Sequence, residues 1–205
     1  MATAATDKQI DAVRRAFRRG GGILRTGDAL DQGIHPRTLY AMRDAGLLER
    51  LDRGLYRLTD LPPLSDPDLV TVANKIPKGV ICLISALHFH DITTQIPHAV
   101  SIAVARGTEP PRLDYPPIRL YWFSGEAFTA GVETHRIDNT PIQIYSAEKT
   151  LADCFKYRNK IRMDTVLEAL TLYRDHKKPR PRKLIEYAKV CRVEKVMRPY
   201  LEALL

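Results

Sequence analysis

The chain has 205 residues, of which 44% are hydrophobic and 27% charged, a composition that is typical of a globular protein and excludes a disordered one. Its formal net charge of +8 and its isoelectric point near 9.5 make nucleic acid the first class of partner to consider. Residues 1–60 carry 11 Lys and Arg against 8 Asp and Glu, residues 146–205 carry 15 against 8, and the residues between them carry 6 against 8. A polyanion would therefore meet the two basic ends first.

Cysteine usage and the distribution of apolar residues indicate the compartment. Cys82, Cys154 and Cys191 lie far apart and form no CxxC pair, which is typical of reduced thiols. The first residues lack a basic segment followed by an apolar one, and no apolar run approaches the ~18–20 residues that span a bilayer. The sequence predicts a soluble, cytoplasmic protein with no membrane contact.

Three short helices are predicted in the first part of the chain. Residues 7–18 place apolar side chains at helical spacing, and the glycines at 20–22 end that helix. Thr26 is the N-cap candidate of a second helix of about two turns. A third helix is predicted over 36–46, because Pro36 suits the first helical position and Gly46 the stop.

A hairpin follows the third helix. Residues 48–58 contain two short segments, each a mixture of apolar and charged residues, on either side of a three-residue turn. Gly54 lies in the turn position that needs a left-handed backbone. Three short helices followed by a hairpin is the order of a winged helix-turn-helix. We therefore predict a DNA-binding domain of this type over residues 1–60.

The second predicted domain, residues 61–205, has mixed α and β character. Three prolines and three acidic residues make 59–68 the best linker candidate. Ser85 is expected to cap a short helix, and the chain is expected to be helical from residue 146 onwards. Strands are predicted at 79–85, 98–106, 118–124, 132–138 and 141–146. The fold class is thus α+β: a winged helix-turn-helix, then a mixed α/β domain with a small sheet and C-terminal helices.

One face of the third helix suits a DNA groove. Leu39 and Met42 supply its buried side, and the positions opposite or beside them are Arg37, Thr38, Tyr40 and Ala41. Arginine can contact guanine bidentately, and a small apolar side chain can meet a thymine methyl group. Arg43 lies nearer the buried side, which favours a phosphate contact or a structural ion pair.

The hairpin offers three more arginines. Arg53 lies at its tip, where a wing can enter a minor groove or follow phosphates, and Arg50 and Arg57 lie on its strands for backbone contacts. The alternative is an ordinary solvated hairpin edge, where charges suppress aggregation. The helix order and the net charge together favour DNA binding.

The second domain offers little chemistry. His88, His90, Asp91 and His98 form the only metal-ligand candidate, and His88 and His90 would lie about 200° apart on a helix. Ser146 and Glu148 are explained by helix capping. The sequence therefore predicts no catalytic residue, no metal site and no cofactor, with a metal-dependent nuclease using those histidines as the alternative.

A basic segment near the C-terminus contains two prolines. It could lie along a phosphate backbone or contact a second protein, and a solubilising loop between helices is an equal alternative. The cations that make it a candidate for a second DNA contact or for toxin neutralisation are Lys177, Lys178, Arg180, Arg182 and Lys183.

These segments resemble a known family. Residues 35–58 (HPRTLYAMRDAGLLERLDRGLYRL) are similar to the N-terminal winged helix of the AbiEi antitoxins of type IV, abortive-infection toxin–antitoxin systems. SALHFHDITTQIPHAVSIAV, LYWFS and YSAEKTLADCF carry the likeness, in order, through the second domain.

The resemblance implies a phage-defence function. Such proteins are transcriptional repressors that bind inverted repeats in double-stranded DNA at the promoter of their own operon, which also encodes a nucleotidyltransferase-like toxin. The second domain would counter that toxin without a stable complex, and direct binding of the toxin is the alternative. By the resemblance, the recognition helix is residues 36–46 and the wing 48–58.

Overall fold

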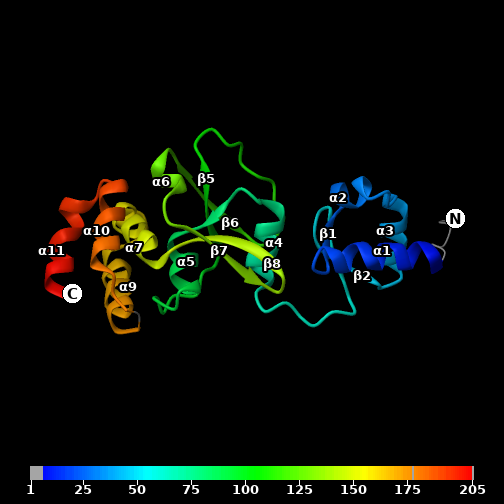
Figure 1. Ribbon diagram of the computed structural model, residues 1–205, viewed down its shortest axis with the longest axis horizontal. Coiled ribbons are helices and arrows are strands. Elements are labelled where there is room, and N and C mark those ends of the chain that lie inside the picture. Colours follow the sequence, from blue (N-terminus) through cyan, green and yellow to red (C-terminus); the bar gives the residue numbers. More distant parts are fainter. Residues whose placement is uncertain (1–6, 177, 205) are drawn as a thin grey trace. The chain divides into compact units, whose positions relative to one another are not determined.

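The computed structural model describes residues 7–176 and 178–204 (Figure 1). The chain divides into two compact units. The first extends to Pro77 and includes the short segments Arg112–Pro116 and Arg136–Pro141. The second comprises Lys78–Pro111, Pro117–His135 and Ile142–Leu205. The N-terminal sheet ends at Leu58, close to the predicted domain boundary at residue 60. That boundary stays a prediction.

The first unit begins with the predicted helices and hairpin. Its helices are α1 (Asp7–Arg19), α2 (Thr26–Asp31) and α3 (Pro36–Asp44), and its strands are β1 (Ile23–Arg25), β2 (Leu48–Asp52) and β3 (Leu55–Leu58). The strands form an antiparallel sheet in the order β1-β3-β2. We call these elements, residues 7–58, the winged-helix module. Phe17, Leu39 and Met42 are almost completely buried in its core, where each adds about 1.5–3 kcal/mol.

Two details of this module differ from the sequence prediction. Strand β1 was not predicted, because a three-residue strand directly after glycines carries no periodic signal. Thr26 is the first residue of α2 and not its cap, which is Arg25. The Thr26 hydroxyl instead donates to the Gly54 carbonyl oxygen at 3.4 Å.

A helix that was not predicted, α4 (Pro67–Lys75), begins within the proposed linker. Pro67 occupies its first turn, and an Asp66 side-chain oxygen accepts a hydrogen bond from the Leu69 backbone N–H at 2.9 Å. Its Leu69, Val70 and Val72 are buried. The sequence contains the cap, the proline and the apolar residues of this helix. The many prolines around them favoured the interpretation of this segment as a linker.

The second sheet has five strands in the order β6-β5-β4-β8-β7. Strand β4 runs antiparallel to β5 and parallel to β8, and β5 runs parallel to β6. The predicted strands are present with small shifts at their ends, except the first. Their bounds are β4 (Val80–Ile81), β5 (Val100–Ala105), β6 (Ile118–Phe123), β7 (Val132–Ile137) and β8 (Thr140–Tyr145).

The predicted strand at 79–85 is wrong beyond its first residues. Only Val80 and Ile81 pair in the sheet, and α5 (Leu83–Phe89) begins directly after Cys82. A short apolar run suits a buried strand and a buried helix equally, so its composition could not separate them. Ser85 lies inside α5 and does not cap it; its hydroxyl oxygen accepts the Ser101 backbone N–H at 2.9 Å.

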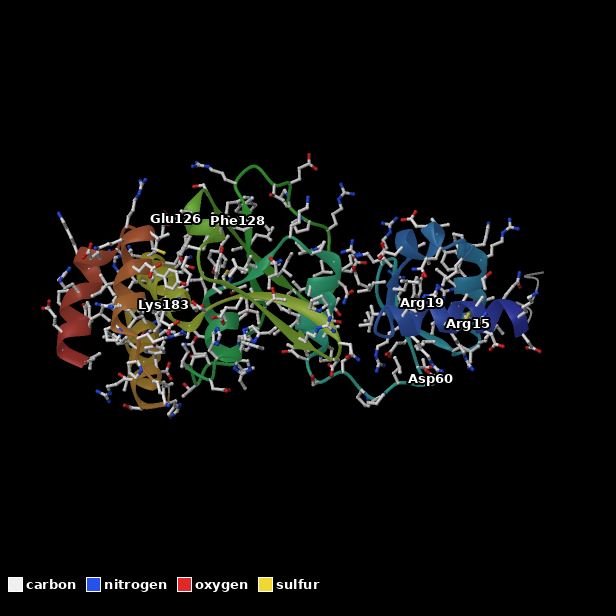
Figure 2. All side chains as sticks on the ribbon, viewed as in Figure 1. Arg15, Arg19, Asp60, Glu126, Phe128 and Lys183 are labelled. Carbon is white, nitrogen blue, oxygen red and sulfur yellow. The ribbon has the colours of Figure 1, made fainter. Side chains whose placement is uncertain are left out.

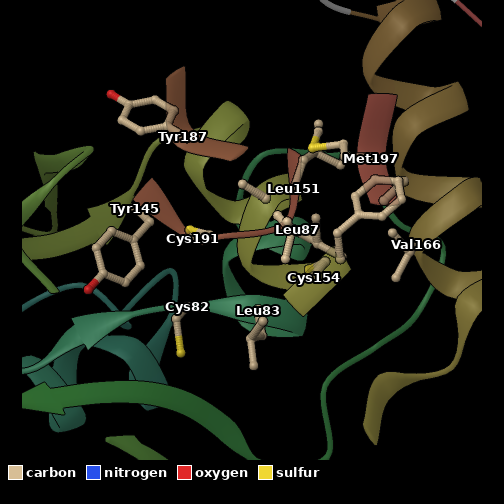
Figure 3. Close-up of a cluster of buried hydrophobic side chains, with 14 of the residues drawn as sticks. Cys82, Leu83, Leu87, Tyr145, Leu151, Cys154, Val166, Tyr187, Cys191 and Met197 are labelled. Atoms are coloured by element: carbon tan, nitrogen blue, oxygen red, sulfur yellow. The ribbon is translucent and has the colours of Figure 1, made fainter. Parts of the chain in front are cut away.

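The helical part of the second unit is largely as predicted, with a short α6 (Glu126–Thr129) preceding it. A single apolar core joins several of its helices to the sheet: Leu87, Leu151 and Met197 meet there from α5, α7 and α11 (Figure 3). No helix among the described residues is both long enough and apolar enough to cross a membrane. The C-terminal helices are α7 (Ala147–Lys156), α8 (Arg158–Ile161), α9 (Met163–His176), α10 (Pro181–Val190) and α11 (Glu194–Leu204).

Helix α7 carries a buried polar network that begins with Glu148. The predicted Ser146 cap is present, because its hydroxyl accepts the Lys149 backbone N–H at 3.3 Å. Glu148 is not a solvated first-turn acid: its side chain is 1% exposed and binds Arg180 through two hydrogen bonds of 2.7 and 2.9 Å. The Tyr173 hydroxyl donates to the same carboxylate at 2.7 Å.

Lys149, the next residue of α7, forms a fully buried ion pair with Asp153. Lys149 Nζ is 2.6 Å from an Asp153 carboxylate oxygen, and both side chains are at most 1% exposed. The Cys191 thiol donates to the other Asp153 oxygen at 3.2 Å. Burial, together with the neighbouring Asp153 charge, raises the pKa of Cys191 to about 12. The three cysteines are free and buried, in keeping with the predicted reduced thiols.

The Glu148 site predicts a pH-dependent stability. Burial raises the pKa of Glu148, but hydrogen bonds from Tyr173 and Arg180 lower it more, so its folded-state pKa lies below the ordinary value. Its stabilising contribution is therefore complete above the unfolded-state pKa of about 4.3 and is lost as the pH falls through the folded-state pKa. We expect the difference in unfolding free energy between the native chain and Glu148→Gln to be larger at pH 7 than at pH 3.5, measured by urea unfolding. A difference independent of pH would contradict this assignment.

Candidate nucleic-acid interface

Helix α3 is fixed in the module by its ends and by one buried side. The His35 ring nitrogen Nδ1 accepts the Arg37 backbone N–H at 3.1 Å, and Pro36 occupies the first turn. Leu39 and Met42 are at most 1% exposed. The helix ends at Asp44, followed by Gly46 at a φ of 72°. Its last carbonyl groups are satisfied by the Gly46 and Leu47 backbone N–H groups at 2.9 Å each, the pattern of a Schellman cap.

The side of α3 opposite Leu39 and Met42 is the one predicted to contact a DNA groove. Arg37 is exposed, Tyr40 is 44% exposed, and Thr38 and Ala41 are half-buried. An exposed aromatic side chain next to an arginine is available for contact rather than needed by the core. The structure therefore brings these four side chains onto the accessible part of one helix.

Arg43 forms a structural ion pair, one of the two roles considered for it. Its guanidinium donates to an Asp44 carboxylate oxygen at 2.7 and 2.9 Å and lies 5.5 Å from the centre of the Tyr40 ring. The hydrogen bonds to Asp44 raise the pKa of Arg43. A phosphate at this position would compete with Asp44 for the Arg43 guanidinium.

The hairpin places Arg53 at an exposed tip. Gly54 has a φ of 71°, as its predicted left-handed position requires, and Arg50 on β2 is exposed. Asp52, at the base of the tip, has a side chain 1% exposed and lies 2.6 Å from Lys75 Nζ. Burial raises the pKa of Asp52, but Lys75 and backbone N–H groups lower it more, and the net shift is downward. The base of the wing is thus held by a charged pair while its tip is open to solvent.

Arg57 contradicts the prediction of a backbone contact. Its side chain is 7% exposed, donates to a Glu49 carboxylate oxygen at 2.5 Å and donates to the Pro62 carbonyl oxygen. The reason is the unpredicted β1, which pairs with β3 and makes β3 the central strand of the sheet. Arg57 is a structural residue and not part of the accessible interface.

Replacing Arg57 with Met should therefore affect folding before it affects DNA binding. Loss of the guanidinium leaves the Pro62 carbonyl and Glu49 without their partner, which costs about 1–3 kcal/mol. We expect a lower unfolding temperature by circular dichroism and an unchanged affinity for DNA at temperatures where the variant is folded. Arg50→Met, on the exposed part of the same hairpin, is the matched control and should leave the unfolding temperature nearly unchanged. Equal effects on stability would contradict the assignment.

Other residues of the module were not predicted as part of a site. His35 is the N-cap of α3, a role that its place before Pro36 signals but that histidine seldom takes. Arg15 and Arg19 add exposed positive charge on α1 (Figure 2).

The histidines of the second unit do not assemble into a site. His88, Asp91 and His98 are exposed, whereas His90 Nε2 lies 2.7 Å from the Tyr145 carbonyl oxygen. In residues 7–176 and 178–204, no three His, Cys, Asp or Glu side chains come together in a way that could hold a metal ion. The nuclease alternative therefore has no ligand set in the described part of the chain.

The basic segment does not act as a single set of cations. Lys177 lies outside the described residues, and Lys178 is exposed. Arg180 is committed to Glu148, with its side chain 54% exposed, while Arg182 and Lys183 are exposed on the first turn of α10. Only part of the segment is therefore available to a partner.

The geometry defines a winged helix-turn-helix module, with an accessible α3 and wing, joined to an α/β unit that ends in helices. Residues 11–59 match the model of a family described as the AbiEi antitoxin transcriptional regulators. The winged-helix module is thus of the AbiEi type, and the predicted resemblance is confirmed for these residues. The match supports, in general terms, a role as an antitoxin-type transcriptional regulator.

The fold as a whole also has a solved counterpart. The RV2827C protein from Mycobacterium tuberculosis superposes with a TM-score of 0.61 at 14% sequence identity, over 92% of this chain and 73% of that one. At this identity the likeness shows the fold alone. No curated protein sequence matches the chain.

Proposed function

We propose that the chain is the antitoxin of a type IV toxin–antitoxin system and represses its own operon by binding inverted repeats in the promoter. The observation that carries the proposal is the accessible face of α3, where Arg37 and Tyr40 stand opposite the buried Leu39 and Met42. Arg53, at the exposed wing tip, supplies a second point of contact. A helix for the major groove and a wing for the adjacent groove or phosphates is how such modules dock on DNA.

In this proposal the chain is a cytoplasmic binding protein without catalytic activity or cofactor. The second unit counters a nucleotidyltransferase-like toxin encoded in the same operon, without a stable complex. The family match of residues 11–59 supports regulation by an antitoxin. Direct binding of the toxin is the competing mechanism, and co-purification of the two chains would favour it.

Footprinting of the DNA upstream of the gene tests DNA binding. We expect two protected half-sites related by an inverted repeat, and an affinity that falls by about three decades between 50 and 200 mM salt if ~6 phosphates are contacted. Absence of any protected repeat would contradict the proposal. Nicking of plasmid DNA in Mg²⁺ or Mn²⁺ would favour the nuclease instead.

A further inference from the structure

The second unit contains an open cleft of about 850 Å³ that the DNA-binding function does not use. Its walls come from the turn between β6 and α6, from the last residue of α7 and from one side of α10. Glu126 on α6 marks one wall (Figure 2). The lining residues are Ser124, Gly125, Glu126, Ala127, Lys156, Arg182, Ile185, Glu186, Lys189, Val190 and Arg192. We call this the cation cleft.

Four cations line the cation cleft against two carboxylates. Arg182, Ile185 and Lys189 recur at the three- and four-residue spacing of one side of α10. Arg192 lines the cleft from just after the end of α10, and Lys156 from the end of α7. All four cations are exposed. Within the described ranges, none of them forms an ion pair, whereas Arg174, Arg180 and Arg198 each bind a carboxylate. The cleft therefore has an excess of positive over negative side chains.

The wall that carries these cations is fixed in place. Arg180, directly before α10, binds Glu148 in the first turn of α7, and Cys191, directly after α10, binds Asp153 further along α7. Residues at both ends of α10 are thus hydrogen-bonded to α7. A preformed arrangement of charges loses little conformational entropy on binding.

We propose that the cation cleft binds a small ligand with two or more phosphate groups, such as a nucleoside diphosphate or triphosphate. The volume lies in the range of about 300–1,000 Å³ that holds small ligands. Lys and Arg side chains are the usual partners of phosphate groups. The Glu126 and Glu186 carboxylates accept hydrogen bonds from hydroxyl or amino groups, which a nucleotide has in addition to its phosphates.

A small ligand fits this charge pattern better than a polynucleotide does. Glu126 and Glu186 lie among the cations and would repel a phosphate backbone that follows the whole cleft. A discrete ligand can place its phosphates against the cations and its neutral part against the carboxylates. The inference is independent of DNA binding by the winged-helix module.

Isothermal titration of the full chain with ATP, GTP, inorganic triphosphate, AMP and adenosine tests the proposal. We expect affinity to rise with the number of phosphates and adenosine not to bind. Lys156→Gln/Lys189→Gln should weaken ATP binding by at least about tenfold, because two charge-assisted contacts are lost. Lys160→Gln/Lys195→Gln removes the same charge from exposed positions outside the cleft and should change the affinity by less than about twofold, as expected for distant screened charges.

Three results would overturn the inference. One is the absence of binding by every phosphate compound at millimolar concentration, with circular dichroism showing a folded chain. Another is an equal loss of affinity in the two double variants, which would indicate a non-specific response to net charge. The third is a single-stranded RNA decamer that binds through Lys156 and Lys189 while ATP and triphosphate do not.

Discussion

Replacing Lys149 with Met is expected to lower the unfolding free energy of the second unit by about 3–5 kcal/mol, because it breaks a buried ion pair. Lys149 Nζ is fully buried 2.6 Å from Asp153, and its ammonium also faces the Tyr145 ring at 4.1 Å. Without it, the one hydrogen bond left to the Asp153 carboxylate among the described residues is the weak one from the Cys191 thiol. Urea unfolding followed by fluorescence measures the loss, since Trp122 is the only tryptophan and lies in β6 of this unit.

The pH dependence and a double variant identify the cause. Burial raises the pKa of Asp153 despite Lys149, and removing the ammonium raises it further. A carboxylate with a raised folded-state pKa loses its stabilising contribution as the pH rises through that value, so the deficit of Lys149→Met should grow from pH 5 to pH 8. Lys149→Met/Asp153→Leu leaves no unpaired charge and should recover most of the stability. If the unfolding free energy of Lys149→Met lies within about 1 kcal/mol of that of the native chain, the assignment of a buried ion pair is contradicted.

The α7 network shows which part of the fold local sequence could predict. Ser146 as a cap follows from residues three positions apart, and it is present. The partner of Glu148 is Arg180, 32 residues away, and no local pattern indicates that pairing or the burial that goes with it. The predicted place of Glu148 in the first turn is correct, and its burial against Arg180 and Tyr173 is what the local sequence did not indicate.

The candidate interface shows the same limit. Helical spacing separates Leu39 and Met42 from Arg37 and Tyr40, and burial confirms that division. For the hairpin, alternation alone treats Arg57 as a strand-edge residue. A third strand, too short to predict, makes β3 the central strand, and the Arg57 guanidinium binds Glu49 and the Pro62 carbonyl oxygen. Periodicity within one helix was sufficient to predict its buried side, whereas the pairing of strands that are distant in sequence could not be predicted.

On the proposed function, Arg37→Ala should weaken binding to the operator by about 1–3 kcal/mol and relax the base preference at one position in each half-site. The physical reason is the place of Arg37 in the first turn of α3, exposed and without an ion pair among the described residues, so its guanidinium is available to a guanine edge. Arg53→Ala removes a charge from the wing and should weaken specific and non-specific DNA binding alike. Competition binding with operator and scrambled duplexes measures both effects.

A charge-matched control separates base reading from electrostatics. Arg106→Ala removes one exposed charge from the second unit and should leave the ratio of specific to non-specific affinity unchanged. For Arg53→Ala the slope of log affinity against log salt should decrease by about 1, because one phosphate contact is lost, while the ratio stays near that of the native chain. For Arg37→Ala the ratio itself should fall. If Arg37→Ala lowers both affinities equally, α3 contacts phosphates, and the bases are read by another part of the module.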